Sequence, residues 1–453
     1  MSAGCSSNIN RIACNLCYHA IHVGFQVSTG LTSSADAASQ YERTAPTGST
    51  TSDAINIALT VGSRLVYAAS QAAVLVLVAR LGGTQETASF IWAMALTAPV
   101  FMFTNMNLCE MISTETAHGY NVRDYWSVRL LSTVGGIALL TAIVPLVAPT
   151  HEWTVIAIVA AGKALESIND LVLGAYHRGE RADRAAISLI TRSIGGCLCL
   201  AAILAITSNV TAGLTGMILF QFSSLIIYDV PYVGQFTGRS LLNSWANIAP
   251  IVRTAFPLGV VACLTSLSLN VSRYTVHGHL DNESLAAFGC CASFLQVFSL
   301  VGVATQLALS PRIASRNAHS RRSMNDMLWR NVAGVALIGM VVVFLAHVWG
   351  PMVLATVYGQ QFAGFGPVLT WLMAAGTFSA AKGFLATGLT TTRSTNSQAA
   401  IAAVQFACSG VGCLWLVPRH GIIAAAWVVA ASSAVSFALH AICTIAAERE
   451  AIA

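Results

Sequence analysis

Long apolar segments recur along almost the whole chain and constrain its fold more than any other feature. A helix of about 20 apolar residues spans the hydrocarbon layer of a bilayer. Only 9% of the 453 residues are charged, against about 25% in soluble domains, so too few polar side chains remain to cover a water-soluble globule. The sequence therefore predicts an all-α polytopic membrane protein with twelve transmembrane helices. We expect these helices at residues 54–79, 87–109, 127–148, 153–176, 184–206, 210–230, 250–276, 284–310, 331–356, 365–391, 396–417 and 421–445.

The arginines in the loops predict the orientation of the chain. Loops that follow odd-numbered helices are short and hold only Arg80 and Arg419. Loops that follow even-numbered helices, or the first residues of the next helix, hold Arg123, Arg129, Arg178, Arg181, Arg184, Arg239, Arg253, Arg312, Arg316, Arg321, Arg322, Arg330 and Arg393. By the positive-inside rule both termini are cytoplasmic. The net charge of +5 belongs to this bias, so we expect no nucleic acid partner.

A weak internal repeat relates the two halves of the chain. At one common offset, Ala160-Ala161-Gly162, Gly174 and Ala185-Ala186-Ile187 match residues 374–376, 388 and 399–401, and a second match relates Phe90 to Phe288. Two pseudo-symmetric six-helix lobes are typical of a transporter that binds its substrate between the halves, near mid-membrane. We expect a disordered cytoplasmic tail (1–51), an N-terminal lobe (52–236), a cytoplasmic linker (237–249), a C-terminal lobe (250–446) and a short cytoplasmic tail (447–453).

The cysteines do not predict a metal site. Cys14 and Cys17 have the spacing of a ligand pair, but the chain contains only one such cysteine pair and no partnering histidine pair stands out. Cys5 follows Ala3-Gly4 as in a lipoprotein cleavage site, yet the preceding apolar run is missing. The cysteines from Cys109 to Cys443 lie in or beside apolar segments, where a free thiol acts as a small hydrophobe.

A few charged residues interrupt the apolar segments and are the candidate functional residues. A charge at mid-bilayer costs about 2.5–3.5 kcal/mol on insertion scales and therefore usually faces a cavity or a partner. At about 100° per residue, Glu166 and Asp170 fall on the same stripe of their helix as Lys163. Two interpretations remain open: Lys163 and Glu166 neutralise each other and lock the helix bundle, or the stripe faces a central cavity, which Glu166 and Asp170 gate or couple to an ion.

Basic residues outnumber acidic ones inside the predicted helices. We expect Arg64, Lys163, Arg273 and Lys382 to line the cavity and to bind substrate. Arg192 either pairs with Asp170 or joins the gating group. A cavity with surplus positive charge attracts anions, and phosphates most of all. A transporter of cations would need the opposite charge, and the first helix has no acidic residue after Asp53.

The polar stripe and two loop motifs resemble the polysaccharide and O-antigen flippase family. That family belongs to the superfamily of the multidrug-and-toxin extruders and the lipid II flippase. The resemblance extends over residues 54–446. The residues that carry it are Lys163-Ala-Leu-Glu-Ser-Ile-Asn-Asp170, Gly174-Ala-Tyr-His-Arg178, Arg181-Ala-Asp-Arg184, Tyr358-Gly359-Gln-Gln-Phe362 and Val417-Pro418-Arg419-His420-Gly421.

The resemblance implies a V-shaped bundle of two lobes in the bacterial inner membrane. It implies transport of undecaprenyl-pyrophosphate-linked oligosaccharides to the periplasmic leaflet by alternating access, for O-antigen or exopolysaccharide biosynthesis. The implied partners are the lipid-linked anionic oligosaccharide, membrane lipids, and a polysaccharide polymerase and chain-length regulator. No cofactor is implied beyond coupling to an H⁺ or Na⁺ gradient. Only two lysines are present, Lys163 and Lys382, fewer basic groups than the family pattern implies, which leaves the charge of the sugar open.

Three alternatives compete with this interpretation. A lipid II-type flippase or a drug antiporter of the same superfamily would share the fold. A membrane-embedded polysaccharide polymerase or ligase would need a catalytic site in an outer loop. The candidates there are His151-Glu152, His277, His279, Asp281 and Glu283. Because a loop histidine is more often solvated than catalytic, we predict no catalytic residue and no enzymatic activity. The absence of a glycine-rich phosphate loop followed by lysine argues against ATP-driven transport by this chain.

Overall fold

The computed structural model describes residues 50–114, 122–179, 181–232, 247–319, 321–391 and 395–452. All regular structure in these ranges is helical. By its internal contacts the chain divides into residues 1–55 and 56–453. The fold described below is that of the second unit. The predicted N-terminal tail with Cys5, Cys14 and Cys17, apart from the start of the first helix, lies outside the described residues.

Each predicted apolar segment coincides with one long helix. The helices are α3 (Thr50–Leu77), α4 (Gly83–Asn105), α6 (Val122–Val147), α7 (Trp153–Arg178), α8 (Ala182–Thr207), α9 (Val210–Ser224), α11 (Ile248–His279), α12 (Asn282–His319), α13 (Arg321–Tyr358), α14 (Gly366–Thr391), α15 (Thr395–His420) and α16 (Ile422–Ile452). The prediction of an all-α, twelve-helix membrane protein is thereby confirmed.

Composition alone identifies ten stretches in the described residues that could cross a membrane. The first of them, Ala58–Ile112, contains α4 and most of α3. Helix α7 is long enough, but Lys163, Glu166 and Asp170 lower its apolar content. The polar stripe is therefore carried by the one long helix whose composition departs from that of its neighbours.

Two of the loops predicted to be short, those after the fifth and the eleventh predicted helix, are tight turns. Only Ser208 and Asn209 separate α8 from α9, and Gly421 alone separates α15 from α16. Ser208 and Gly421 have φ angles of 52° and 68°, in the left-handed region that ends helices. The side chain of Asn209 then caps α9 by accepting a hydrogen bond from the backbone N–H of Ala212 (3.0 Å).

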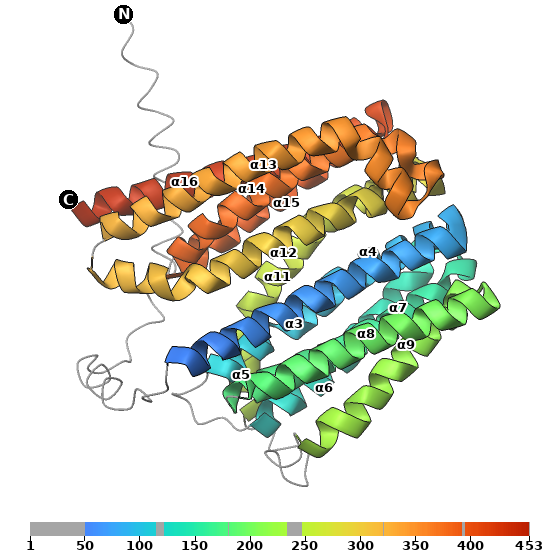
Figure 1. Ribbon diagram of the computed structural model, residues 1–453, viewed down its shortest axis with the longest axis horizontal. Coiled ribbons are helices and arrows are strands. Elements are labelled where there is room, and N and C mark those ends of the chain that lie inside the picture. The colour runs from blue at the N-terminus through green and yellow to red at the C-terminus, as the bar shows by residue number, and fades with distance from the viewer. Residues whose placement is uncertain are drawn as a thin grey trace, which may run out of the picture. The chain divides into compact units, whose positions relative to one another are not determined.

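The helices form an N-terminal lobe (α3–α9) and a C-terminal lobe (α11–α16), blue to green and yellow to red in Figure 1. Helix α7 packs against α4, α6 and α9, and its counterpart α14 packs against α12, α13 and α16 in the same pattern. Helix α8 pairs with α9 as α15 pairs with α16. This correspondence of packing is what the internal repeat predicts.

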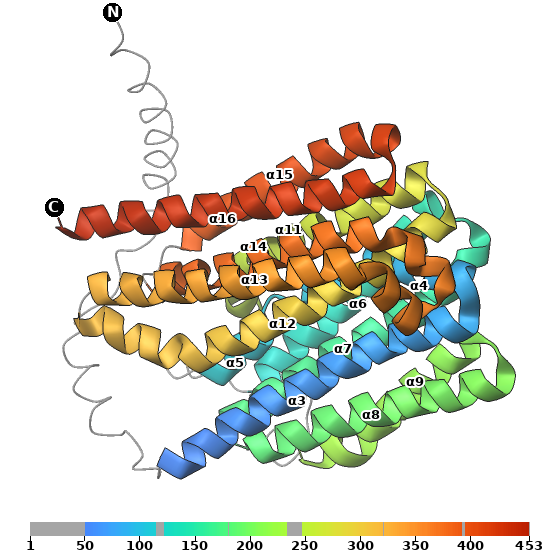
Figure 2. The same cartoon turned by 45° about the horizontal axis from the view of Figure 1, so that its top comes forward.

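Helix α3 is the exception to the correspondence. In the C-terminal lobe, α11 packs closely along α15, with the Ser272 hydroxyl 3.3 Å from the thiol of Cys413. Helix α3 lies beside α8 in both views (Figures 1 and 2), but their backbones do not approach in the same way. Bulky polar residues of α3, Tyr67 and Gln71, and Arg192 of α8 occupy the space between them.

The two lobes meet along α4, which packs against α11 and α12. The Tyr274 hydroxyl donates a hydrogen bond to the carbonyl oxygen of Ala95 (2.6 Å). The rings of Trp92 and His277 stack with their centroids 3.8 Å apart. Near the other end of the contact, a Cβ on Gly259 would lie 2.7 Å from the carbonyl oxygen of Phe103, so the glycine permits close approach of the two backbones.

The predicted boundaries between lobes and tails fall as follows. Most of the linker predicted at 237–249 lies outside the described residues, and α11 begins at Ile248. Helix α16 continues to Ile452 and so includes residues 447–452 of the predicted C-terminal tail.

Candidate functional site

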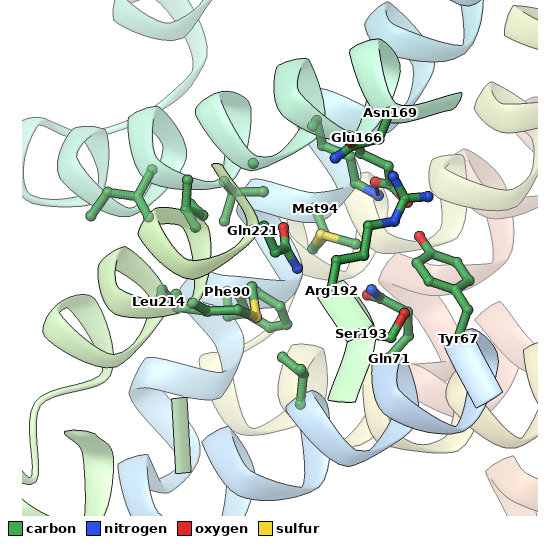
Figure 3. Close-up of a pocket in the computed structure, with 17 residues that line it drawn as sticks. Tyr67, Gln71, Phe90, Met94, Glu166, Asn169, Arg192, Ser193, Leu214 and Gln221 are labelled. Carbon is green, nitrogen blue, oxygen red and sulfur yellow. Dashed lines mark hydrogen bonds and ion pairs between the residues drawn. The ribbon is translucent and has the colours of Figure 1, made fainter. Parts of the chain in front are cut away.

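A pocket lined by apolar, polar and charged side chains lies inside the N-terminal lobe (Figure 3). Its lining comes from α3, α4, α7, α8 and α9. Apolar side chains such as Phe90, Met94 and Leu214 form part of its wall. The polar residues of the lining are Tyr67, Gln71, Lys163, Glu166, Asn169, Arg192, Ser193 and Gln221. The pocket thus presents a concentrated polar surface within an otherwise apolar bundle.

Three charged residues line this pocket: Lys163 and Glu166 from α7 and Arg192 from α8. The Lys163 ammonium lies 2.7 Å from a carboxylate oxygen of Glu166, and the two side chains are 22% and 34% exposed. This is the contact expected if the pair neutralises itself. Both residues also line the pocket, which lies inside the N-terminal lobe and not between the two lobes.

Arg192 is buried and reaches the same part of the pocket as Glu166 and Asn169 (Figure 3). Its Nη1 has no hydrogen-bond partner among the described residues. The side-chain oxygen of Asn169, also buried, has none either. Two residues of the pocket lining therefore each carry one buried polar atom without a partner in the described residues, beside the Lys163–Glu166 ion pair.

Asp170 belongs to a different cluster. Its partner is Arg129 of α6, with 3.4 Å between Nη2 and the carboxylate oxygen. Arg129 is fully buried and also donates hydrogen bonds to Asn105 of α4 and Ser167 of α7. The suggested ion pair between Arg192 and Asp170 is wrong, because Asp170 pairs with Arg129 instead. Arg129 is accordingly an interior residue and should not be counted among the loop arginines that indicate topology.

Arg64 lies outside the pocket lining. It is exposed on α3 and has no hydrogen bond or ion pair in the described part of the chain. Residues Arg64, Tyr67 and Gln71 follow the helical spacing of one face, and the latter two line the pocket. Arg64 therefore lies one turn beyond the pocket on the same side of α3.

Arg273 and Lys382 lie in the C-terminal lobe. Arg273 of α11 donates a hydrogen bond to the side-chain oxygen of Asn270 (2.6 Å), and its Nε is buried without a partner in the described residues. Lys382 of α14 donates to Gln405 of α15 (2.8 Å) and Ser436 of α16 (3.4 Å). No carboxylate pairs with either cation within the described ranges.

The structure thus does not gather the four predicted cations into one pocket. Lys163 lines the N-terminal pocket together with the predicted gating residues Glu166 and Arg192. Lys382 is held among helices of the C-terminal lobe. The substrate-binding and gating roles of all seven residues remain predictions.

Sequence reasoning missed the buried carboxylate of Asp229. It lies at the end of the π-helical turn Leu225–Asp229 and accepts hydrogen bonds from the hydroxyls of Tyr176 (2.9 Å) and Ser188 (3.0 Å). Its position at the very end of the predicted sixth helix made it resemble a loop residue. The signal available was that it is the only acidic residue in that segment.

Comparison with known proteins shows what this architecture is similar to. No protein-family model matches the chain. The capsular polysaccharide biosynthesis protein CapF of Staphylococcus aureus is 22% identical over 366 residues, covering 80% of this chain and 92% of that protein. Among solved structures, the lipid II flippase MurJ in an inward closed conformation has a TM-score of 0.67 at 12% identity, over 86% of this chain and 87% of MurJ.

A multidrug transporter of the MATE type from Vibrio cholerae has a TM-score of 0.60 at 12% identity, over 88% of this chain and 98% of that one. At these identities the likeness to solved structures establishes the fold alone. The chain has the two-lobe fold shared by MurJ and the MATE transporters. These findings confirm the resemblance predicted from the sequence.

Proposed function

We propose that the protein is a flippase of the bacterial inner membrane with both termini in the cytoplasm. Its substrate is an undecaprenyl-pyrophosphate-linked oligosaccharide, moved to the periplasmic leaflet by alternating access for O-antigen or exopolysaccharide biosynthesis. An H⁺ or Na⁺ gradient drives the cycle. A polysaccharide polymerase and a chain-length regulator act with it. The two-lobe fold and the likeness to a capsular polysaccharide biosynthesis protein support this proposal.

The observation that carries the choice of substrate is the set of cations without carboxylate partners. Arg64, Arg273 and Lys382 lie in membrane-spanning helices and have no ion-pair partner among the described residues. An unpaired charge in this setting is costly unless a ligand or water meets it. The pyrophosphate of a lipid-linked sugar supplies the matching negative charge. A cationic drug would be repelled.

The outer-loop residues do not support an enzyme. Asp281 caps α12 by accepting a hydrogen bond from the backbone N–H of Ser284 (2.9 Å), and His277 is stacked on Trp92. We propose transport without covalent chemistry.

Substitution of the unpaired cations tests the proposal in cells. Arg64→Ala and Lys382→Ala, singly and together, should reduce surface polysaccharide and cause lipid-linked repeat units to accumulate, because the protein loses cationic groups that attract pyrophosphate. The protein should stay in the membrane at the wild-type level by immunoblot. The matched control is Arg419→Ala, since Arg419 is exposed beside Trp415 at the far end of α15. Normal export by the double variant would contradict the proposed substrate.

A further inference from the structure

The N-terminal pocket contains more cationic than anionic groups. Its charged lining residues are two cations, Lys163 and Arg192, and one carboxylate, Glu166. Asp170 does not alter this balance because its own partner is Arg129. Asp229 and Asp170 are near enough to interact electrostatically with Arg192, but neither residue is part of the pocket lining. The carboxylate of Asp229 accepts hydrogen bonds from Tyr176 and Ser188.

The arrangement also leaves hydrogen-bonding capacity unused. Arg192 is 7% exposed and Asn169 is 2% exposed, yet Nη1 of the first and Oδ1 of the second have no partner among the described residues. Buried polar groups without partners carry a desolvation cost of about 1–3 kcal/mol each. Such groups are expected where a ligand or ordered water completes the hydrogen bonding.

Glu166 is the only carboxylate among the residues that line the pocket, so it competes with an incoming anion for the two cations. Its carboxylate already holds Lys163 at 2.7 Å, and it lies beside Arg192 (Figure 3). Because Lys163 is 22% exposed and Glu166 is 34% exposed, a ligand can reach both. An anionic ligand that binds the two cations must displace this carboxylate.

We propose that Lys163 and Arg192 form an anion subsite for one phosphate group in the N-terminal lobe, and that Glu166 occupies it as an intramolecular anion while no ligand is bound. This inference rests on the proposed function, since the phosphate would be that of the lipid-linked substrate. While no ligand is bound, the carboxylate lowers the net positive charge of the pocket, and with it the cost of holding two cations within the membrane. The phosphate displaces the Glu166 carboxylate from the two cations, and Asn169 and Ser193 of the lining contact the bound phosphate.

The subsite is tested by isothermal titration calorimetry on the purified full-length protein in lipid nanodiscs. The probes are inorganic pyrophosphate and farnesyl diphosphate, which carry the same anion without and with a lipid tail. Tighter binding of farnesyl diphosphate indicates a lipid-linked ligand. Equal binding of both probes indicates a site for free phosphate.

Removing the competing charge should strengthen binding. Glu166→Gln should lower the Kd for farnesyl diphosphate about tenfold, because a charge-assisted hydrogen bond no longer has to be exchanged. Arg192→Gln should raise it about tenfold. Glu166→Asp retains the charge and should bind as the wild type does, which separates the effect of the charge from a folding defect. Glu86→Gln, an exposed site on α4 outside the lining, is the matched control.

Three results are decisive. Tighter binding by Glu166→Gln alone among the carboxylate variants supports the subsite. Unchanged or weaker binding by Glu166→Gln overturns it, whatever Arg192→Gln does, and leaves the proposed function standing. Failure of the wild-type protein to bind either probe overturns the subsite, whereas the proposed function is overturned only by the export and leaflet-exchange measurements.

Discussion

Arg129 illustrates how a single buried charge organises the N-terminal lobe. The guanidinium connects α6 to Asn105 of α4 and to Ser167 and Asp170 of α7. The two ends of its ion pair differ in environment, since the side chain of Arg129 is 0% exposed and that of Asp170 is 40% exposed. Substitution of Arg129 and substitution of Asp170 should therefore lower the free energy of unfolding by different amounts.

Asp170→Asn should destabilise the protein more than Arg129→Met. The first leaves a buried guanidinium without its carboxylate, a loss of about 3–5 kcal/mol for a broken buried pair. The second leaves a carboxylate that water can reach. Thermal unfolding of both variants in detergent, followed by tryptophan fluorescence, measures the difference. Asp183→Asn, which breaks the exposed pair with Arg181, should change the free energy of unfolding by less than about 1 kcal/mol. An equal loss for Arg129→Met and Asp170→Asn would contradict this account.

At the residue scale the sequence predicts which charges matter better than it predicts their partners. The contact between Lys163 and Glu166 follows from helical spacing, because both residues belong to one helix. The partner of Asp170 does not follow in this way. Arg129 lies near the start of its apolar segment, where it is indistinguishable from a residue that marks the cytoplasmic side. Only the packing of α6 against α7 decides between these roles.

At the scale of the helices, close packing of α7 against α5 (Leu108–Thr114) depends on Gly174. A Cβ on Gly174 would lie 2.4 Å from the side chain of Ile112 and 3.0 Å from the backbone oxygen of Cys109. Its counterpart in the repeat is Gly388. A Cβ on Gly388 would lie 2.5 Å from Cδ1 of Leu328 and at least 3.8 Å from every other atom outside its own helix. The backbone contact at Gly174 cannot be relieved by rotating a side chain, whereas only the end of a side chain opposes a Cβ at Gly388.

Gly174→Ala should therefore cost more stability than Gly388→Ala, although the two glycines are equivalent in the repeat. We expect a loss of about 1–3 kcal/mol at Gly174, the usual effect of overpacking, and a smaller one at Gly388. Unfolding temperatures of the purified variants compare them. Gly135→Ala, where nothing lies within 4 Å of the added Cβ, should be neutral or stabilising by up to about 1 kcal/mol. A larger loss at Gly388 than at Gly174 would refute the argument.

The helices themselves could be predicted from the sequence because each is a long apolar segment bounded by a turn or a charged loop. The pocket could not. It lies between α3 and α8, whose backbones make few close contacts, whereas α11, the counterpart of α3, packs closely along α15. That difference depends on how Tyr67, Gln71 and Arg192 fill space between helices, which is a property of tertiary packing that no local pattern encodes.

At the scale of the whole molecule, two lobes with the same internal packing carry different charge arrangements. In the N-terminal lobe the ion pairs Lys163–Glu166 and Arg129–Asp170 cancel much of the charge. In the C-terminal lobe Arg273 and Lys382 are bound only by neutral side chains in the described residues. A symmetric fold with an asymmetric charge distribution fits a transporter whose substrate is anionic at one end and a neutral or weakly charged sugar elsewhere.

The central claim is that this fold moves an anionic lipid-linked saccharide across a bilayer. The most direct measurement is leaflet exchange of a fluorescent polyprenyl-diphosphate-linked saccharide in liposomes that contain the purified protein, followed by reduction of the outward-facing label with dithionite. The account predicts exchange faster than in protein-free liposomes, slowed at least about tenfold in the Arg273→Ala, Lys382→Ala double variant, where two charge-assisted contacts are lost. Exchange no faster than in protein-free liposomes, or wild-type rates in the double variant, would contradict it.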